Sequence, residues 1–268
     1  MSRNEVGPDF VEAVARGVEV LRSFGDSKRP LTLREVATST GLARATARRV
    51  ILTLEHLGYV RSEEGGYTVT PRVLELGMAH VLRSGVWAAA RAHLADLVKT
   101  TNQAASIAQL DGADIIYVAR VEIPKMVALS VDVGTRLPSE STALGKVLLA
   151  SLSPEHLETT LALAPRSPVI PHHPIDRRML EEQLREIRAQ GWAATDEEIH
   201  PGVRSVAAPL RDGEGRVFAA INIAAISSEL SHRQLIDECL PLLLRTASQI
   251  STDYAQLAAA PQFTVSPG

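Results

Sequence analysis

Arginine is the residue whose type and spacing suggest chemistry most clearly in this sequence, and it occurs in two settings. The first is a cluster at Arg44, Arg48 and Arg49, followed by Arg61. A guanidinium group can donate two parallel hydrogen bonds to a phosphate or to the edge of a guanine base. Seven basic and two acidic residues lie from Lys28 to Arg61, a local excess of five positive charges in a chain whose net charge is −3. This distribution is typical of a small nucleic-acid-binding module, although a basic face exposed to water would give the same count.

The residues around this cluster predict the secondary structure that would present it. Thr32 and Glu35 have the spacing of a capping box, which begins a short helix that ends at Gly41. A second helix, expected over residues 43–57, has apolar residues on one side and the arginines on the other. A β-hairpin over residues 59–70 follows. This order of elements predicts a winged helix-turn-helix whose second helix enters the major groove of DNA.

The predicted DNA contacts lie on the two helices and the hairpin. They are Thr32, Arg44, Ala45, Thr46, Arg48, Arg49, Arg61 and Tyr67. The small Ala45 side chain allows the helix to approach the bases, whereas Arg48 and Arg61 are expected to point toward phosphates. Glu63 and Glu64 at the tip of the hairpin would be repelled by phosphate, so the wing is expected to touch DNA little.

The second setting consists of single arginines inside apolar stretches, namely Arg120, Arg136 and Arg204. Because arginine keeps its charge, a buried guanidinium needs an anion beside it. An internal Asp or Glu could supply that anion, and so could the carboxylate of a bound ligand. Small residues dominate segments 139–143 and 222–225, which would leave room for such a ligand.

Other candidate chemistries have weaker support. Gly145-Lys146 resembles the end of a phosphate-binding loop, but that motif requires Gly where Glu140 stands and Ser or Thr where Val147 stands. His172-His173 suggests a metal, yet adjacent residues in a Pro-rich loop point in different directions. The acidic run 196–198 has no nucleophile or base partner at motif spacing. We therefore expect no catalytic residue, no metal site and no cofactor.

Length and composition indicate how these residues are distributed over domains. A chain of 268 residues with 45% apolar and 22% charged residues is typical of a globular protein of two domains. A single cysteine and the lack of a long apolar stretch predict a cytoplasmic protein without a membrane partner. We expect a DNA-binding domain over residues 1–70, a linker helix over 71–84, a larger domain able to hold a small molecule over 85–258 and a loose tail over 259–268.

The larger domain alternates between helical patterns and patterns of period two. Strands are expected at 106–110, 114–121, 127–133, 203–210 and 216–225. In the second of these, strict alternation would place Tyr117 on one face and Arg120 on the other. Asn222 in the last strand could donate or accept a hydrogen bond with a ligand. Hairpins interleaved with helices predict an α+β fold in which a mainly antiparallel sheet is covered by helices and encloses a small-molecule cavity.

Three segments make the chain resemble the IclR family of bacterial transcriptional regulators. Residues 31–60, LTLREVATSTGLARATARRVILTLEHLGYV, are similar to the winged helix-turn-helix of that family. Residues 134–150, GTRLPSESTALGKVLLA, and residues 191–224, GWAATDEEIHPGVRSVAAPLRDGEGRVFAAINIA, resemble its effector-domain signatures. Together with residues 116–121, they are most similar to the regulators of protocatechuate and hydroxybenzoate catabolism.

The resemblance implies a GAF-like effector domain, a homodimer or dimer of dimers, double-stranded operator DNA as partner, and a small organic acid as effector. By the matching positions, the effector site would be lined by Gly134, Thr135, Ser141, Thr142, Ala143, Asp196, Val206, Asn222 and Ala224. The arginines Arg120, Arg136 and Arg204 complete the predicted effector-binding residues.

The sequence thus predicts a ligand-responsive transcription factor. Two other classes of protein stay open on the residues alone. One is a hydrolase or isomerase that uses the C-terminal cavity, and the other is a small-molecule sensor that signals to a protein partner. A mobility-shift assay distinguishes the transcription factor from these two classes, because only the transcription factor requires DNA binding.

Overall fold

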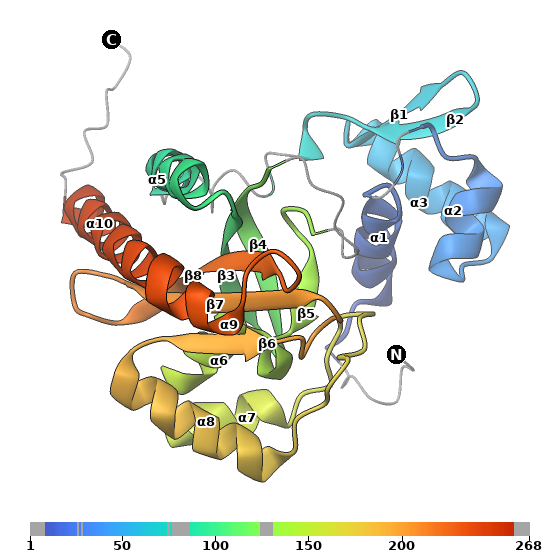
Figure 1. Ribbon diagram of the computed structural model, residues 1–268. Coiled ribbons are helices and arrows are strands. Elements are labelled where there is room, and N and C mark those ends of the chain that lie inside the picture. The colour runs from blue at the N-terminus through green and yellow to red at the C-terminus, as the bar shows by residue number, and fades with distance from the viewer. Residues whose placement is uncertain are drawn as a thin grey trace. The chain divides into compact units, whose positions relative to one another are not determined.

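The computed structural model describes residues 9–25, 27, 29–73, 76, 86–123 and 131–259 (Figure 1). The chain divides into two compact units, Met1–Arg83 and Ser84–Gly268. Most of the predicted linker helix over 71–84 and the predicted tail over 259–268 lie outside the described residues.

The N-terminal unit consists of three helices and a two-stranded sheet. Its elements are α1 (Glu12–Ser23), α2 (Leu33–Thr40), α3 (Arg44–His56), β1 (Val60–Glu63) and β2 (Gly66–Val69). The capping box of Thr32 and Glu35 begins α2, and Gly41 ends it with a left-handed φ of 66°. The strands pair antiparallel, so the predicted winged helix-turn-helix is present.

A small apolar core holds these elements together. It is formed by Val20, Phe24, Val36, Ile51, Leu54 and Val60, each buried. Backbone bonds in both directions between Leu31 and Tyr67 attach the hairpin to the start of α2. A Cβ at position 66 would lie 2.3 Å from the Leu31 carbonyl oxygen, which explains why glycine stands there.

The C-terminal unit is built around a six-stranded sheet in the order β5-β4-β3-β8-β7-β6, and every neighbouring pair is antiparallel. The strands are β3 (Ala104–Asp111), β4 (Asp114–Val121), β5 (Arg136–Pro138), β6 (Ala193–Asp196), β7 (Val203–Arg211) and β8 (Val217–Ile226). Both β5 and β6 are additions to the strands expected from the sequence. The expected strand over 127–133 falls largely outside the described residues, and residues 131–133 are not in a strand.

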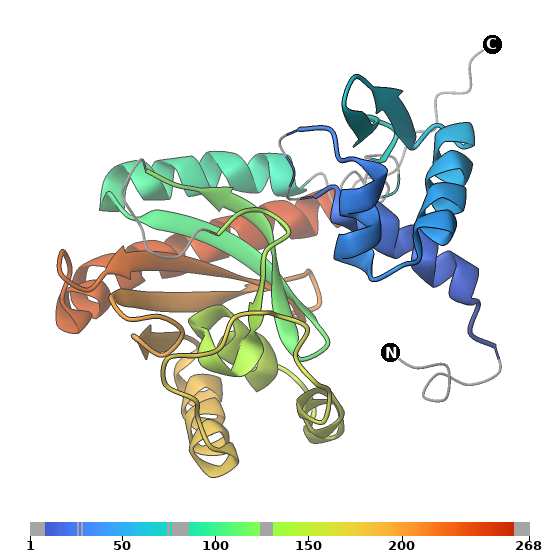
Figure 2. The same cartoon turned by 90° about the vertical axis from the view of Figure 1, so that its right-hand side faces the viewer.

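Helices cover both faces of this sheet (Figures 1 and 2). They are α5 (Val86–Thr101), the short 3₁₀ helix η2 (Ser139–Ser141), α6 (Ala143–Ala150), α7 (Pro154–Leu161), α8 (Arg177–Gln190), α9 (His232–Gln234), the π-helical turn η3 (Leu235–Cys239) and α10 (Leu240–Ala259). One apolar cluster lies between the sheet and α5 with α10, and a second lies between the sheet and α6 with α8. The α+β class predicted from the sequence is therefore confirmed.

The start of α6 is held tightly against η2. The Thr142 hydroxyl caps the helix by accepting a hydrogen bond from the Gly145 N–H at 3.1 Å. A Cβ at position 145 would lie 2.1 Å from the Ser139 carbonyl oxygen. Glycine at this position therefore serves close packing and not phosphate binding. No helix among the described residues is long and apolar enough to span a membrane.

Candidate DNA interface and ligand cavity

Helix α3 presents a basic face to solvent. Arg44, Ala45, Arg48 and Arg49 are exposed, and Thr46 is half-buried. The opposite side of the helix is buried in the core of the N-terminal unit through Ala47, Ile51 and Leu54. No ion pair between described residues engages the three arginines of this face. The structure thus brings together five of the sequence-predicted DNA contacts on one exposed surface.

The remaining predicted contacts lie in more constrained surroundings. The Thr32 hydroxyl donates to Glu35 Oε2 at 2.8 Å and accepts from the Glu35 N–H at 3.3 Å. A guanidinium bond from Arg29, together with the bonds from Thr32, lowers the pKa of Glu35 to about 2. On the wing, Arg61 is exposed but lies 2.6 Å from the Glu63 carboxylate, and Tyr67 is half-buried. The wing therefore offers DNA a partly neutralised surface.

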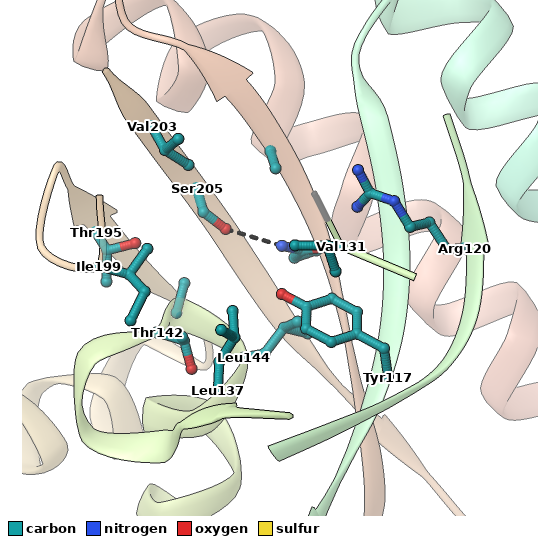
Figure 3. A pocket seen from close by; sticks show the side chains of 13 residues that line it. Tyr117, Arg120, Val131, Leu137, Thr142, Leu144, Thr195, Ile199, Val203 and Ser205 are labelled. Carbon is teal, nitrogen blue, oxygen red and sulfur yellow. Dashed lines mark hydrogen bonds between the residues drawn. The ribbon is translucent and has the colours of Figure 1, made fainter. Parts of the chain in front are cut away.

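In the C-terminal unit, a cavity of about 60 Å³ lies between the sheet and the start of α6 (Figure 3). It is lined by Tyr117, Arg120, Val131, Leu137, Thr142, Ala143, Leu144, Thr195, Ile199, Val203, Ser205, Asn222 and Ala224. Most of this lining is apolar. Tyr117 points its hydroxyl into the cavity, and Arg120 lies at the margin, on the opposite side of the cavity from Thr195 and Ile199 (Figure 3).

Arg120 and Asn222 supply the polar end of the cavity. Arg120 Nη1 donates to Ser106 Oγ at 3.0 Å, and its Nε donates to Glu122 Oε2 at 3.1 Å. Asn222 is 4% exposed and donates from Nδ2 to Ser205 Oγ at 3.0 Å. Asn222 Oδ1 is buried and has no hydrogen-bond partner among the described residues. An unpartnered buried acceptor of this kind is costly unless a ligand or water donates to it.

A β-bulge decides which residues of β4 reach the cavity. The register between β3 and β4 shifts between Ile107 and Ala108, so that Val118 is the extra residue of β4. As a result, Tyr117 and Arg120 line the same cavity, whereas Ala119 packs into the cluster under α5 and α10. The expectation from strict alternation, which placed Tyr117 and Arg120 on opposite faces, is wrong for this reason.

The other two candidate arginines do not line the cavity. Arg136 pairs with Asp111 at 2.6 Å and with the buried Asp114 at 3.4 Å. Arg204 pairs with Asp196 and donates to the backbone carbonyls of Ser227 and Leu230. Internal carboxylates therefore satisfy both guanidinium groups, which is the first of the two possibilities that the sequence left open.

Of the effector-site residues implied by the family resemblance, some line the cavity and others do not. Thr142, Ala143, Asn222 and Ala224 line the cavity. Gly134, Thr135, Ser141, Asp196 and Val206 are not among its lining residues. Their strand neighbours Thr195 and Ser205 take the places expected for Asp196 and Val206, because successive side chains of a strand point to opposite faces.

Several lining residues had no signal in the sequence. In the sequence, Tyr117, Leu137, Leu144, Ile199 and Val203 have the pattern of ordinary core residues, and only the tertiary structure shows that they line the cavity. Burial raises the pKa of Tyr117 to about 12, so its phenol is neutral and can donate a hydrogen bond.

Two other pairs of polar residues are not among the lining residues of the cavity. His172 and His173 have ring centroids 4.1 Å apart, and no group of three metal-ligating side chains occurs among the described residues. Lys146 is buried and paired with Glu198. Desolvation lowers the pKa of Lys146, while Glu198 opposes this effect.

A unit that presents a basic helix on a winged helix-turn-helix, joined to a unit with a small internal cavity, defines the class of ligand-responsive DNA-binding regulators. The family described as IclR helix-turn-helix domain matches residues 13–64, and the family described as bacterial transcriptional regulator IclR C-terminal matches residues 78–252. The chain belongs to the IclR family of transcriptional regulators, with an N-terminal DNA-binding domain and a C-terminal ligand-binding domain.

Individual relatives agree with this assignment. The Pca regulon regulatory protein of Pseudomonas putida is 33% identical over 91% of this chain and 84% of its own length. The p-hydroxybenzoate hydroxylase transcriptional activator of Acinetobacter baylyi is 30% identical over 90% of this chain and 91% of its own length.

Among solved structures, an IclR homologue from Microbacterium hydrocarbonoxydans, complexed with 4-hydroxybenzoate, superposes with a TM-score of 0.79. It covers 91% of this chain and 99% of its own, at 23% identity, and so shows the shared fold.

Proposed function

We propose that this regulator binds operator DNA through α3 and is controlled by an aromatic carboxylate held in the cavity of the C-terminal unit. The observation that carries the proposal is the Arg120 guanidinium, only 12% exposed, at the polar end of a mostly apolar cavity. A carboxylate matches the fork of guanidinium donors. An aromatic ring would lie against Leu137, Leu144 and Ile199, beside the Tyr117 ring.

The hydroxyl groups of the cavity support a ring that itself carries hydroxyl groups. Thr142, Thr195 and the neutral phenol of Tyr117 can each donate or accept a hydrogen bond. The relatives named for Pca and p-hydroxybenzoate regulation favour hydroxybenzoates as the ligand class. The effector acts only if it binds two arrangements of the protein with different affinity, since equal affinity would shift no equilibrium.

On DNA, Arg44, Ala45, Thr46 and Arg49 are assigned to the major groove, and Arg48 with Arg61 to phosphates. We assign the active form to a homodimer or a dimer of dimers that reads half-sites roughly 34 Å apart, or a multiple of that distance. An exposed apolar stripe, formed by Val11 directly before α1 and by Val14 and Val18 within it, supports association of two copies. We place the protein in the cytoplasm, where its DNA target lies.

The lining of the cavity argues against a hydrolase or isomerase. Among the described lining residues there is no Asp, Glu or His that could act as a general base beside Ser205 or a threonine. The Ser205 hydroxyl instead accepts a hydrogen bond from Asn222. This set of side chains is suited to holding a ligand and not to activating a nucleophile.

A mobility-shift assay with DNA from upstream of the chain's own gene tests the proposal. The full-length protein is expected to shift this DNA at low salt, and 4-hydroxybenzoate or protocatechuate is expected to change its affinity. Binding should weaken with salt along a log–log slope of roughly −0.9 per phosphate contact. A salt-independent shift contradicts the proposed interface, and DNA affinity that none of these acids changes contradicts the proposed effector class.

A further inference from the structure

The side chain of Arg120 separates two neighbouring cavities. The inner cavity is the one described above, and a second cavity of about 50 Å³ lies beside it. Arg120, Val203 and Ala224 line both cavities, whereas Glu122 lines only the outer one. Arg120 is therefore one of three residues that lie between the inner compartment and an outer compartment whose lining includes Glu122.

Arg120 makes two polar side-chain contacts, and of the two partners only Glu122 lines a cavity. Ser106, which is fully buried, accepts from Nη1. Glu122, whose side chain is 60% exposed, accepts from Nε at 3.1 Å. The guanidinium is thus held by the buried Ser106 and neutralised by the Glu122 carboxylate, which is already exposed to water. An exposed carboxylate can be released to water at little cost, because such ion pairs contribute little free energy.

The size of the inner cavity makes this arrangement relevant to ligand binding. An engineered apolar cavity of roughly 150 Å³ binds benzene. The inner cavity, at about 60 Å³, is smaller than this. A ring with a carboxylate substituent therefore requires additional space, and the adjoining compartment behind Arg120 supplies it when the guanidinium moves.

Building on the proposed function, we propose that Glu122 competes with the carboxylate of the effector for the Arg120 guanidinium. In the effector-free protein Glu122 holds Arg120 between the two compartments. The effector carboxylate then replaces Glu122 on the guanidinium, and the two compartments join. One carboxylate is exchanged for another, so the buried guanidinium keeps an anionic partner throughout. A neutral analogue cannot make this exchange, which renders the site selective for carboxylates.

The test compares 4-hydroxybenzoate with its neutral analogue 4-hydroxybenzamide by calorimetry on the full-length protein. The Glu122→Gln variant is expected to bind the acid roughly two- to fivefold more tightly than the wild type. The acid no longer has to displace the Glu122 carboxylate, and an exposed ion pair changes a binding constant by up to about this factor. The affinity of this variant for the amide should be unchanged, because a neutral ligand leaves the ion pair of Arg120 and Glu122 intact and the two side chains then move together.

Asp237→Asn is the matched control. Asp237 pairs with Arg233 at 3.2 Å and is also 60% exposed, but it does not line either cavity. This variant should bind the acid as the wild type does. Circular dichroism and DNA affinity at low salt verify that each variant is folded.

The outcomes separate the inference from the proposed function. If the wild type binds the acid and Glu122→Gln binds it equally or more weakly, the competitor role is overturned while the proposed function stands. Equal tightening for acid and amide also overturns it, since easier entry alone would then explain the gain. If neither protein binds any aromatic acid, the proposed effector class fails and this inference fails with it.

Discussion

Lys146 Nζ lies 2.5 Å from Glu198 Oε2, and the lysine side chain is only 1% exposed. This ion pair joins α6 to the segment between β6 and β7. The N-cap of α6, Thr142, and its residue Leu144 both line the cavity. The segment between β6 and β7 contributes Ile199 to the cavity and is held in place by hydrogen bonds from the backbone of His172 and His173 to the carbonyls of Ile199 and Glu198. The ion pair therefore connects two elements that line the ligand cavity, α6 and the segment between β6 and β7.

Removing one member of this pair should destabilise the C-terminal unit strongly. Lys146→Met leaves the Glu198 carboxylate, which is 18% exposed, without its cation. Loss of one partner of a fully buried pair costs roughly 3–5 kcal/mol, and the cost here should lie at or below the lower end of that range. Trp192 packs against the apolar cluster under α5 and α10, so tryptophan fluorescence in urea reports the unfolding of this unit.

The double variant Lys146→Met/Glu198→Leu should recover much of the loss, because an apolar pair can replace a buried ion pair. Glu182→Gln, which removes the exposed pair with Arg178, serves as the control and should change the free energy of unfolding by less than about 1 kcal/mol. If Lys146→Met unfolds at the wild-type urea concentration, the pair has no structural role.

Acid should weaken the start of α2 through Glu35. Bonds from Arg29 and Thr32 hold its folded-state pKa near 2, below the ordinary value of 4.5. A carboxyl with a depressed folded-state pKa contributes stability above its unfolded-state pKa and loses it as pH falls through the folded-state pKa. We expect the thermal midpoint of the N-terminal unit, followed by NMR signals from α2, to exceed that of Glu35→Gln at pH 6. The difference should vanish near pH 2. A difference that is constant over this range would exclude the carboxylate as its cause.

Arg49 should contribute to specific DNA binding. Arg49→Ala removes a guanidinium from the exposed face of α3 and is expected to cost roughly 1–3 kcal/mol of operator binding if the side chain contacts a base. Fluorescence anisotropy on operator and scrambled duplexes measures this loss. Arg178→Ala, an exposed arginine in the other unit, is the control and should bind DNA normally. Undiminished operator affinity of Arg49→Ala would remove Arg49 from the interface.

Arg120 and Arg136 should behave differently toward the effector. Arg120→Gln removes the guanidinium of the cavity and is expected to weaken binding of 4-hydroxybenzoate by about tenfold or more, since a hydrogen bond to a charged group is worth roughly 1.5–3 kcal/mol. Arg136→Gln should leave this affinity unchanged, because Asp111 and Asp114 already bind its guanidinium. Both variants should bind DNA as the wild type does. Equal effects of the two substitutions on calorimetric affinity would contradict the assignment of Arg120.

The winged helix-turn-helix could be predicted from the sequence because its signals are local. The capping box of Thr32 and Glu35, the turn at Gly41 and the apolar side of α3 each depend on residues a few positions apart. The α+β class and the family were predicted for the same kind of reason, from periodicity and contiguous motifs. The β5 and β6 strands escaped this reasoning because segments of three and four residues are too short for an alternating pattern to be distinguished.

The ligand cavity could be predicted only in part. The sequence by itself determined that arginines in apolar stretches would need anions and that small residues near 142 and 222 would leave space. Only the tertiary structure decided which arginine faces the cavity. The bulge beside Ala108 turns Arg120 to the same face as Tyr117, while Asp111, Asp114 and Asp196 neutralise Arg136 and Arg204. Strand register and ion pairing bring together residues that are distant in the chain, and one residue of register reverses the face on which a side chain lies.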